Sequence, residues 1–203
     1  EVLIRDFDKD RNYQNLIDKK EYFKKLNINA IQLMPIMEFE GNESWGYNTS
    51  YHMALDKFYG NKNKLKEFID LCHENGIAII LDLAINHSFG RNPLVRMWMN
   101  DPDKDGWGEP SSENPYFNTV PTHTYSVGYD FNHQNSVTQE YTKQVIKYWI
   151  EEFKIDGIRW DLTKGFTQNC NKNDYKCTDS YQQDRVDILK MYADYSWLID
   201  PLH

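Results

Sequence analysis

The chain alternates between apolar runs typical of strands and apolar residues at helical spacing. The strand-like runs lie at residues 2–7, 28–35, 77–83 and 155–162. Each is followed by a helical pattern, at 13–26, 65–72, 141–153 and 183–195. This order predicts a βα unit that occurs four times.

The helical patterns also predict which side chains are buried. The clearest one places four apolar residues at i, i+3, i+4 and i+7, with a glycine where the helix should end: Leu65, Phe68, Ile69, Cys72 and Gly76. In the last helix, the inward side chains are expected to be Val186, Leu189 and Ala193. Cys72 is therefore expected to act as a small buried hydrophobe.

Repeated βα units form a parallel α/β sheet, either doubly wound or closed as a barrel. The run at 77–83 is almost wholly apolar, as expected of a strand covered on both faces. A doubly wound nucleotide-binding fold would have a glycine-rich turn after its first strand, but residues 7–12 contain no glycine. We therefore expect a partial (β/α)8 TIM barrel with about the first four βα units.

One connection is much longer than the rest. Residues 88–135, after the third strand, are rich in Pro, Gly, Asn and aromatic residues without a clear period. We interpret this segment as an inserted loop subdomain over the mouth of the barrel. The predicted division is residues 1–87 for the first two βα units and strand three, 88–135 for the insert, and 136–203 for helix three, strand four and helix four.

Composition narrows the class of partner. The chain has 203 residues, 15% of them aromatic, and a formal net charge of -8. Nucleic acids and anionic membranes reward a basic face, so neither is expected as a partner. No apolar run reaches the roughly 18 residues of a membrane span. The aromatic content suggests a ligand surface, and a chain of this charge accommodates a neutral or cationic ligand more easily.

The cysteines say little about location. Cys170 and Cys177 bracket a polar loop and can pair in an oxidising compartment, but the spacing leaves free thiols open as well. The compartment stays undetermined, with an extracellular or periplasmic location slightly favoured over a cytoplasmic one.

Polar side chains gather where two of the strands end. Asp82 lies at the end of the third strand, with Asn86 and His87 just after it, and Arg159 and Asp161 lie at the end of the fourth. Barrel enzymes place their active sites at this edge of the sheet. An Asp and an Arg two residues apart on a strand often form only an ion pair. Because Asp82 and His87 are predicted at the same edge of the sheet, a functional site is favoured here.

These residues resemble the α-amylase family of glycoside hydrolases. The resemblance rests on Asp82-x-x-x-Asn86-His87, on the insert that follows it, and on Gly157-x-Arg159-x-Asp161. Two further segments, Gly46-Tyr47-Asn48 and residues 32–35, also resemble family segments. The resemblance covers essentially the whole chain and implies the N-terminal half of the catalytic barrel with its inserted domain.

The chemistry of a retaining glycosidase fits these residue types. Such an enzyme uses a carboxylate nucleophile and a second carboxylic acid about 5 to 5.5 Å away. We take Asp161 as the nucleophile. Arg159 points to the same side of the strand and can hold Asp161 ionised. Asp82 can fix the guanidinium of Arg159 by paired hydrogen bonds.

The resemblance implies further contacts. In the family, the positions of His87 and Tyr47 contact the sugar that is attacked, and that of Lys164 contacts the leaving-group side. Trp45 is a second candidate sugar platform, although packing under the insert would explain it equally well. Asn86 matches a calcium ligand of calcium-dependent members, and Asp130 is a candidate for another. Calcium takes about six to eight oxygen ligands, so two residues are weak support for it.

Two departures from the family pattern limit the prediction. Gly165 stands where many members carry a histidine after the lysine. The acid/base Glu of the family follows a fifth strand, and residues 1–203 end before that strand would begin. We expect a parent enzyme that hydrolyses or transfers α-glucan oligosaccharides or polysaccharides such as starch, and an inactive fragment in residues 1–203. A carbohydrate-binding relative without catalysis is the alternative.

Four other histidines receive no role from the sequence. His52, His73, His123 and His133 match no motif and are expected on the surface or in loops.

Overall fold

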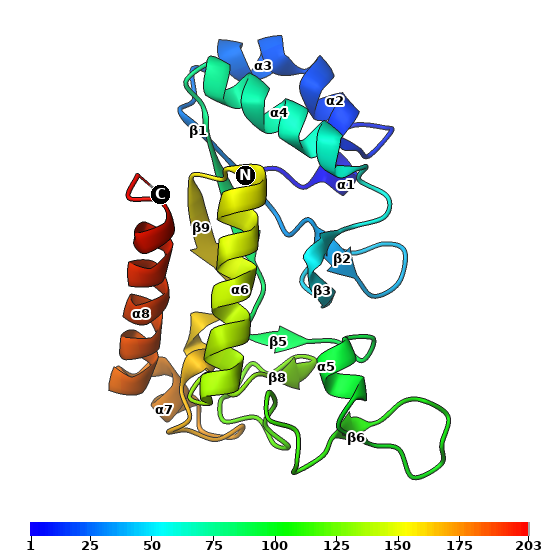
Figure 1. The fold of residues 1–203 in the computed structure, drawn as a ribbon, viewed down its shortest axis with the longest axis vertical. Coiled ribbons are helices and arrows are strands. Elements are labelled where there is room, and N and C mark those ends of the chain that lie inside the picture. Colours follow the sequence, from blue (N-terminus) through cyan, green and yellow to red (C-terminus); the bar gives the residue numbers. More distant parts are fainter. Residues whose placement is uncertain (203) are drawn as a thin grey trace.

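A three-stranded parallel sheet forms the centre of the molecule. The computed structural model describes residues 1–202. The strands of this sheet are β1 (Ala30–Leu33), β4 (Ala78–Leu83) and β9 (Gly157–Trp160), in the order β1-β4-β9. Val2 adds an isolated parallel bridge to Leu33, on the other side of β1 from β4. The sheet therefore adds its segments in chain order and in one direction (Figure 1).

The helices follow the strands as the sequence predicts. The longer ones are α4 (Lys62–Glu74), α6 (Ser136–Phe153) and α8 (Gln183–Ile199). Figure 1 shows α6 and α8 side by side, while α2 (Tyr13–Asp18), α3 (Lys20–Lys25) and α4 gather at one end of the molecule. Among residues 1–202, no helix combines the length and the apolar character that a membrane crossing requires.

The remaining elements are short. They comprise the helices α1 (Ile4–Phe7), α5 (Pro93–Arg96), η1 (Thr163–Phe166) and α7 (Tyr175–Asp179), and the strands β2 (Met37–Phe39), β3 (Thr49–Leu55), β5 (His87–Ser88), β6 (Met99–Asn100), β7 (Glu109–Pro110) and β8 (Tyr129–Asp130). Strands β2 and β3, β5 and β8, and β6 and β7 form antiparallel pairs.

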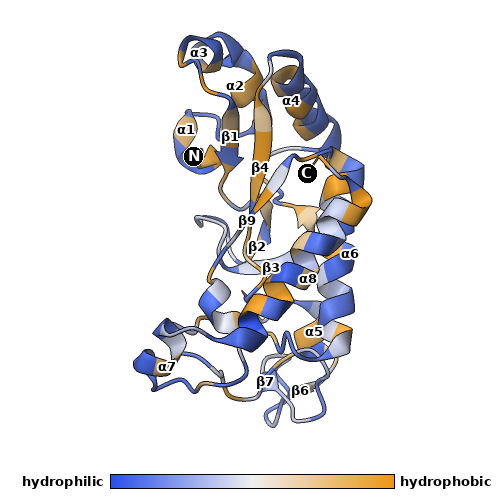
Figure 2. Ribbon diagram, turned by 90° about the vertical axis from the view of Figure 1, so that its left-hand side faces the viewer, coloured by the Kyte–Doolittle hydropathy of each residue, from blue (hydrophilic) through white to orange (hydrophobic). Residues whose placement is uncertain are grey.

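The core packs between the sheet and these helices. Strand β4 is the most apolar strand in Figure 2, and Ile79, Leu81 and Leu83 are at most 1% exposed. The predicted face of α4 is buried as expected, including Cys72, which is a free thiol. Trp149 of α6 is fully buried, and its indole donates to the His52 carbonyl over 2.9 Å. Strand β4 lies between β1 and β9 at the centre of this core.

The N-terminal segment differs from its prediction. Only Val2 pairs as a strand would, and residues 4–7 form the helical turn α1. Ile4 and Phe7 stand three residues apart, so one helical turn brings both toward the core, where Phe7 stacks on Phe23. The helix predicted at 13–26 is likewise two helices, which meet at Lys19.

The last helix turns a different face inward. Its buried residues are Ile188, Tyr192 and Ser196, whereas Val186, Leu189 and Ala193 are only half-buried. Tyr192 sets this orientation because its ring stacks on Trp160 of β9 and its hydroxyl contacts His133. A large aromatic side chain with both contacts outweighs three smaller apolar ones.

Candidate active site

Neighbouring strands bring the three predicted catalytic residues together. The register of β4 and β9 sets Asp82 opposite Arg159. Arg159 Nη1 donates to both oxygens of Asp82, over 2.9 and 3.0 Å, and to Asp161 Oδ1 over 2.8 Å. The three side chains therefore form one chain of charge-assisted hydrogen bonds at the carboxyl end of the sheet.

Burial divides the two carboxylates by role. Asp82 is completely buried, and burial raises its pKa, while the hydrogen bonds from Arg159 and Tyr47 act in the opposite direction. Burial also opposes the charge of Arg159, but its bonds to Asp82 raise the pKa of the guanidinium overall, so Arg159 stays protonated. The Asp161 side chain remains 18% exposed. A ligand can thus reach Asp161, whereas Asp82 serves to hold Arg159.

Tyr47 and His87 join this group from neighbouring segments. The Tyr47 hydroxyl donates to Asp82 Oδ2 over 2.8 Å, and burial and this bond raise the pKa of Tyr47. His87 Nε2 donates to the Tyr47 carbonyl over 2.6 Å. Burial lowers the pKa of His87, which favours a neutral ring. Nδ1 of His87 is buried without a hydrogen-bond partner among the described residues, and in the neutral ring it is an acceptor.

Three buried donors hold the backbone between Asp82 and His87. Nε2 of His52 donates to the Ala84 carbonyl over 3.2 Å, and Nε2 of His133 donates to the Ile85 carbonyl over 2.9 Å. The Phe131 amide donates to the Asn86 carbonyl over 3.0 Å. Three successive carbonyls are thereby fixed, and Asn86 and His87 with them.

His52, His123 and His133 were predicted to lie on the surface or in loops. The prediction of surface exposure is wrong, because all three side chains are buried. All three are at most 1% exposed, because each finds acceptors or donors in the interior. Nδ1 of His52 faces the Tyr141 hydroxyl, and Nδ1 of His133 faces the Tyr192 hydroxyl. These partners are distant in sequence, so no local pattern could reveal them. His73 lies at the surface, where it pairs with Asp156 over 2.8 Å.

The other two predicted sugar contacts lie nearer the surface. Lys164 shares a cavity of about 590 Å³ with Arg159, Asp161 and Tyr125. Its ammonium pairs with Asp179, whose hydrogen bond raises the pKa of Lys164. Trp45 is 59% exposed, which argues against simple packing under the insert.

Of the two predicted calcium ligands, Asn86 is better suited to bind a metal than Asp130. Both side-chain atoms of Asn86 are buried without a hydrogen-bond partner among the described residues, as a ligand residue would be. Asp130 is already occupied: Oδ1 accepts from His123 Nε2 over 3.0 Å, and Oδ2 accepts from Asn118 and Thr122. Burial opposes the charge of His123, but these contacts with Asp130 raise its pKa overall. The two residues alone fall far short of calcium's oxygen requirement, and we assign no catalytic step to a metal.

Gly165 is explained by the same neighbourhood. A Cβ at this position would lie 1.8 Å from Asn86 Oδ1 and 2.7 Å from His123 Nε2. The space that a larger residue would need is thus filled by Asn86 and His123. The departure from the lysine-histidine pattern has this steric reason.

An acidic loop in the insert, which carries Asp101, Asp103 and Asp105, was not among the predicted site residues. The carboxylates of Asp101, Asp103 and Asp105 can bring ligand oxygens within 4.8 Å of one another. The signal was available, because Asp-x-Asp-x-Asp-Gly matches the beginning of an EF-hand loop. Ser112 stands at the position of that loop's final Glu, so the match is partial.

Known proteins are similar to this chain in sequence. The sequence profile described as "Alpha amylase, catalytic domain" matches residues 6–200. Alpha-amylase 3 of Dictyoglomus thermophilum is 34% identical over 193 residues, which cover 85% of this chain and 38% of that protein. The 1,4-alpha-glucan branching enzyme of Shewanella baltica is 35% identical over 153 residues, covering 74% of this chain and 19% of that one.

The fold is also similar to that of a solved structure. The α-amylase of Geobacillus thermoleovorans, solved with acarbose, superposes with a TM-score of 0.66 at 22% identity and covers 93% of this chain and 38% of that one. This chain therefore spans well under half the length of the relatives that it matches.

Proposed function

The chain belongs to the α-amylase catalytic-domain family, and we propose that its protein is a retaining enzyme that cleaves or transfers α-glucan chains through Asp161. The observation that carries the proposal is the hydrogen-bond chain from Tyr47 through Asp82 and Arg159 to Asp161. A binding protein has no need of a partly exposed carboxylate oriented in this way. The family relatives act on α-glucans, and they include both hydrolases and a branching enzyme.

In the proposed reaction, an Asp161 oxygen attacks the anomeric carbon and displaces the leaving sugar's oxygen. Arg159 holds Asp161 in place by its 2.8 Å hydrogen bond, while buried Asp82 fixes Arg159 from behind. The glycosyl-enzyme ester is then released by water or by a sugar hydroxyl, with net retention. The acid that protonates the leaving oxygen is assigned to the family's fifth strand, outside residues 1–203.

The sugar contacts are proposed for four side chains. Neutral His87 is proposed to accept a hydrogen bond at Nδ1 from a hydroxyl of the attacked sugar, because its Nε2 already donates to the Tyr47 carbonyl. Tyr47 lies beside Asp82 and offers its ring to the same sugar. Lys164 contacts the leaving-group side from the shared cavity, and Trp45 offers an exposed second platform.

The proposed architecture is the first half of a (β/α)8 barrel with an insert. A sheet that adds strands in one direction is suited to closure, and β9 offers its outer edge to a further strand. The proposed insert, residues 88–135, leaves and returns at adjacent points because His87 pairs with Asp130 and Ser88 with Tyr129. Residues 1–87 and 136–203 then belong to the barrel itself.

Asp161→Asn in the full-length protein tests the proposal. Hydrolysis of starch and maltoheptaose should fall by several orders of magnitude, because the neutral amide cannot form the ester. Asp187→Asn, on the exposed face of α8, is the matched control and should keep full activity. Retained turnover in Asp161→Asn would exclude it as nucleophile. If the wild-type protein binds maltoheptaose but does not cleave it, the carbohydrate-binding alternative would be favoured.

A further inference from the structure

We propose that Tyr125 is a sugar platform beside Asp161, held by the disulfide-closed loop after β9, and that it sets the preference of the enzyme for longer α-glucan chains. The proposal rests on the proposed function and adds a specificity residue to it. Tyr125 belongs to the insert, whereas Asp161 and Lys164 follow β9, yet all three line the same cavity of about 590 Å³.

The orientation of the Tyr125 ring is fixed by three contacts. Its hydroxyl lies 3.2 and 3.1 Å from the two oxygens of Asp179. The Lys164 ammonium lies 5.2 Å from the ring centroid, and the Tyr175 ring meets it nearly at right angles at 5.5 Å. The residue is nevertheless 44% exposed, and Tyr175 is 60% exposed. A tethered aromatic pair thus stays open to a ligand at the edge of the active-site cavity.

The backbone conformation of Tyr125 indicates that surrounding contacts hold this residue in place. Its φ is +64°, in the left-handed region that residues other than glycine rarely adopt. The preceding residue is anchored, because the Thr124 amide donates to the buried Thr178 hydroxyl over 3.1 Å. Unusual backbone conformations persist where surrounding contacts fix them, and they concentrate at ligand sites.

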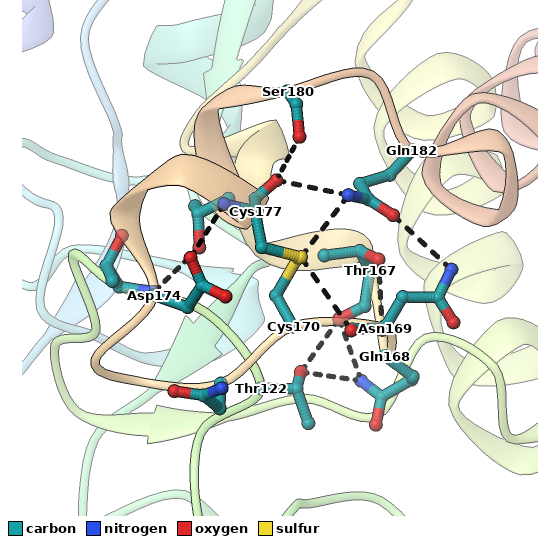
Figure 3. The surroundings of a disulfide bond; sticks show 12 residues. Thr122, Thr167, Gln168, Asn169, Cys170, Asp174, Cys177, Ser180 and Gln182 are labelled. Carbon is teal, nitrogen blue, oxygen red and sulfur yellow. Dashed lines mark hydrogen bonds between the residues drawn. A yellow bond between two sulfur atoms is a disulfide. The ribbon is translucent and has the colours of Figure 1, made fainter.

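The loop that carries the partners of Tyr125 is closed covalently. Cys170 and Cys177 form a disulfide seven residues apart (Figure 3). Asp174 accepts from the Cys177 amide at the start of α7, and Gln182 donates to the Cys177 carbonyl, as the dashed lines in Figure 3 show. Helix α7 carries both Tyr175 and Asp179. The disulfide therefore restrains the helix that orients the Tyr125 ring.

Hydrogen bonds join this loop to the insert at a second place. The Thr122 hydroxyl donates to the Thr167 carbonyl over 2.7 Å and accepts from Gln168 Nε2 over 3.2 Å (Figure 3). With the Thr124 to Thr178 bond, these contacts attach residues 122–125 of the insert to the loop on both sides of His123. Tyr125 thereby keeps a fixed place relative to Lys164.

The chemistry of the platform matches a neutral sugar chain. An exposed aromatic ring packs against the apolar C–H face of a pyranose, and its polar rim hydrogen-bonds hydroxyls. Lys164 and Asp179 supply such a donor and acceptor at the rim, and their charges offset each other. Because Lys164 lies on the leaving-group side in the proposed reaction, the platform would hold glucosyl units beyond the cleaved bond.

The test compares two substrates in the full-length enzyme. Maltoheptaose places sugars beyond the cleaved bond, whereas an aryl α-maltoside with a nitrophenyl leaving group places none there. Tyr125→Ala should raise KM for maltoheptaose about tenfold and leave KM and kcat for the aryl substrate within about twofold. Tyr125→Trp, which keeps a platform, should restore most of the affinity. Tyr181→Ala removes a tyrosine that is 69% exposed and lies just after α7 in the chain. It should leave KM and kcat unchanged for both substrates.

The disulfide supplies an independent arm. Cys170→Ser combined with Cys177→Ser should raise KM for maltoheptaose severalfold without affecting the aryl substrate. Equal losses on both substrates in Tyr125→Ala, or no loss on either, would overturn the inference while leaving the proposed function intact. A wild-type protein that turns over neither substrate would instead refute the proposed function.

Discussion

At the scale of single residues, the site depends on one guanidinium that serves two carboxylates. Arg159 Nη1 contacts both Asp82 and Asp161, and the first of these is fully buried. A buried carboxylate is costly unless hydrogen bonds satisfy it, and Asp82 accepts them from Arg159 and Tyr47. Asp82 thus holds Arg159 in position, and the partly exposed Asp161 is left for chemistry.

Arg159→Lys should therefore impair both catalysis and stability. A lysine ammonium keeps the charge but cannot reproduce the planar hydrogen-bonding geometry of the guanidinium. We expect kcat of the full-length enzyme on maltoheptaose to fall at least tenfold, because Asp161 loses its fixed donor. Tm should fall as well, because the buried Asp82 then keeps only the hydrogen bond from Tyr47 in its present geometry. Arg5→Lys, at the exposed pair with Asp6, is the control and should leave kcat unchanged. An unchanged kcat in Arg159→Lys would contradict the positioning role.

At the scale of elements, two close approaches of the chain place the site. Gly46, just before Tyr47, has φ +96°, and a Cβ there would lie 2.4 Å from the Pro35 carbonyl oxygen. This turn brings the Tyr47 hydroxyl to Asp82. On the other side, Gly165 in η1 lets that helical turn lie against Asn86. Each glycine permits a contact between segments far apart in the sequence.

Gly165→Ala tests the second approach. The added methyl group would overlap the Asn86 amide, which is itself fully buried and held by its backbone. Overpacking of this kind costs about 1–3 kcal/mol. We expect the free energy of unfolding in urea to fall by about that amount. Gly157→Ala in β9 is the matched control, because its nearest neighbour would be Ile80 Cγ1 at 3.6 Å, an ordinary contact. Equal stability of the two variants would contradict the steric account.

At the scale of the whole molecule, buried histidines connect the layers. His133 links the carbonyl after β4 to Tyr192 of α8, and His52 links the same segment to Tyr141 of α6. Burial lowers the pKa of His52 to about 3 and that of His133 to about 4. Both rings are neutral in the folded protein at neutral pH, with Nε2 as the donor.

These histidines should make the protein lose stability in acid. An unfolded histidine has a pKa of about 6.5, so between about pH 6.5 and 4 the unfolded chain binds protons that the folded one does not. The stabilisation is complete above pH 6.5 and decreases as pH falls, by about 1.4 kcal/mol per pH unit for each histidine. His133→Gln should therefore flatten the decline of Tm between pH 6 and 4.5 in calorimetry of the full-length protein. A decline as steep as that of the wild type would contradict the assignment.

The sequence predicted the pieces of the fold better than their ends. The strands at β4 and β9 and the helices α4 and α6 lie where the apolar pattern placed them. For β4, α4 and α6 the reason is that each buries a stripe of apolar side chains. The strand predicted at residues 2–7 was wrong, because the spacing of Ile4 and Phe7 suits a helical turn as well as a strand. The disulfide between Cys170 and Cys177 was left open because the spacing of two cysteines does not report their separation in space.

By itself, the sequence determined the βα order and the charged residues that follow β4 and β9, because a strand delivers its last side chains to one edge of the sheet wherever it folds. Only the tertiary structure decided that His52 and His133 are buried and that Tyr125 reaches the cavity of Asp161. The contacts of the two histidines join residues 32 to 89 positions apart, and long-range packing and burial govern them. Local pattern carries no information about such pairs.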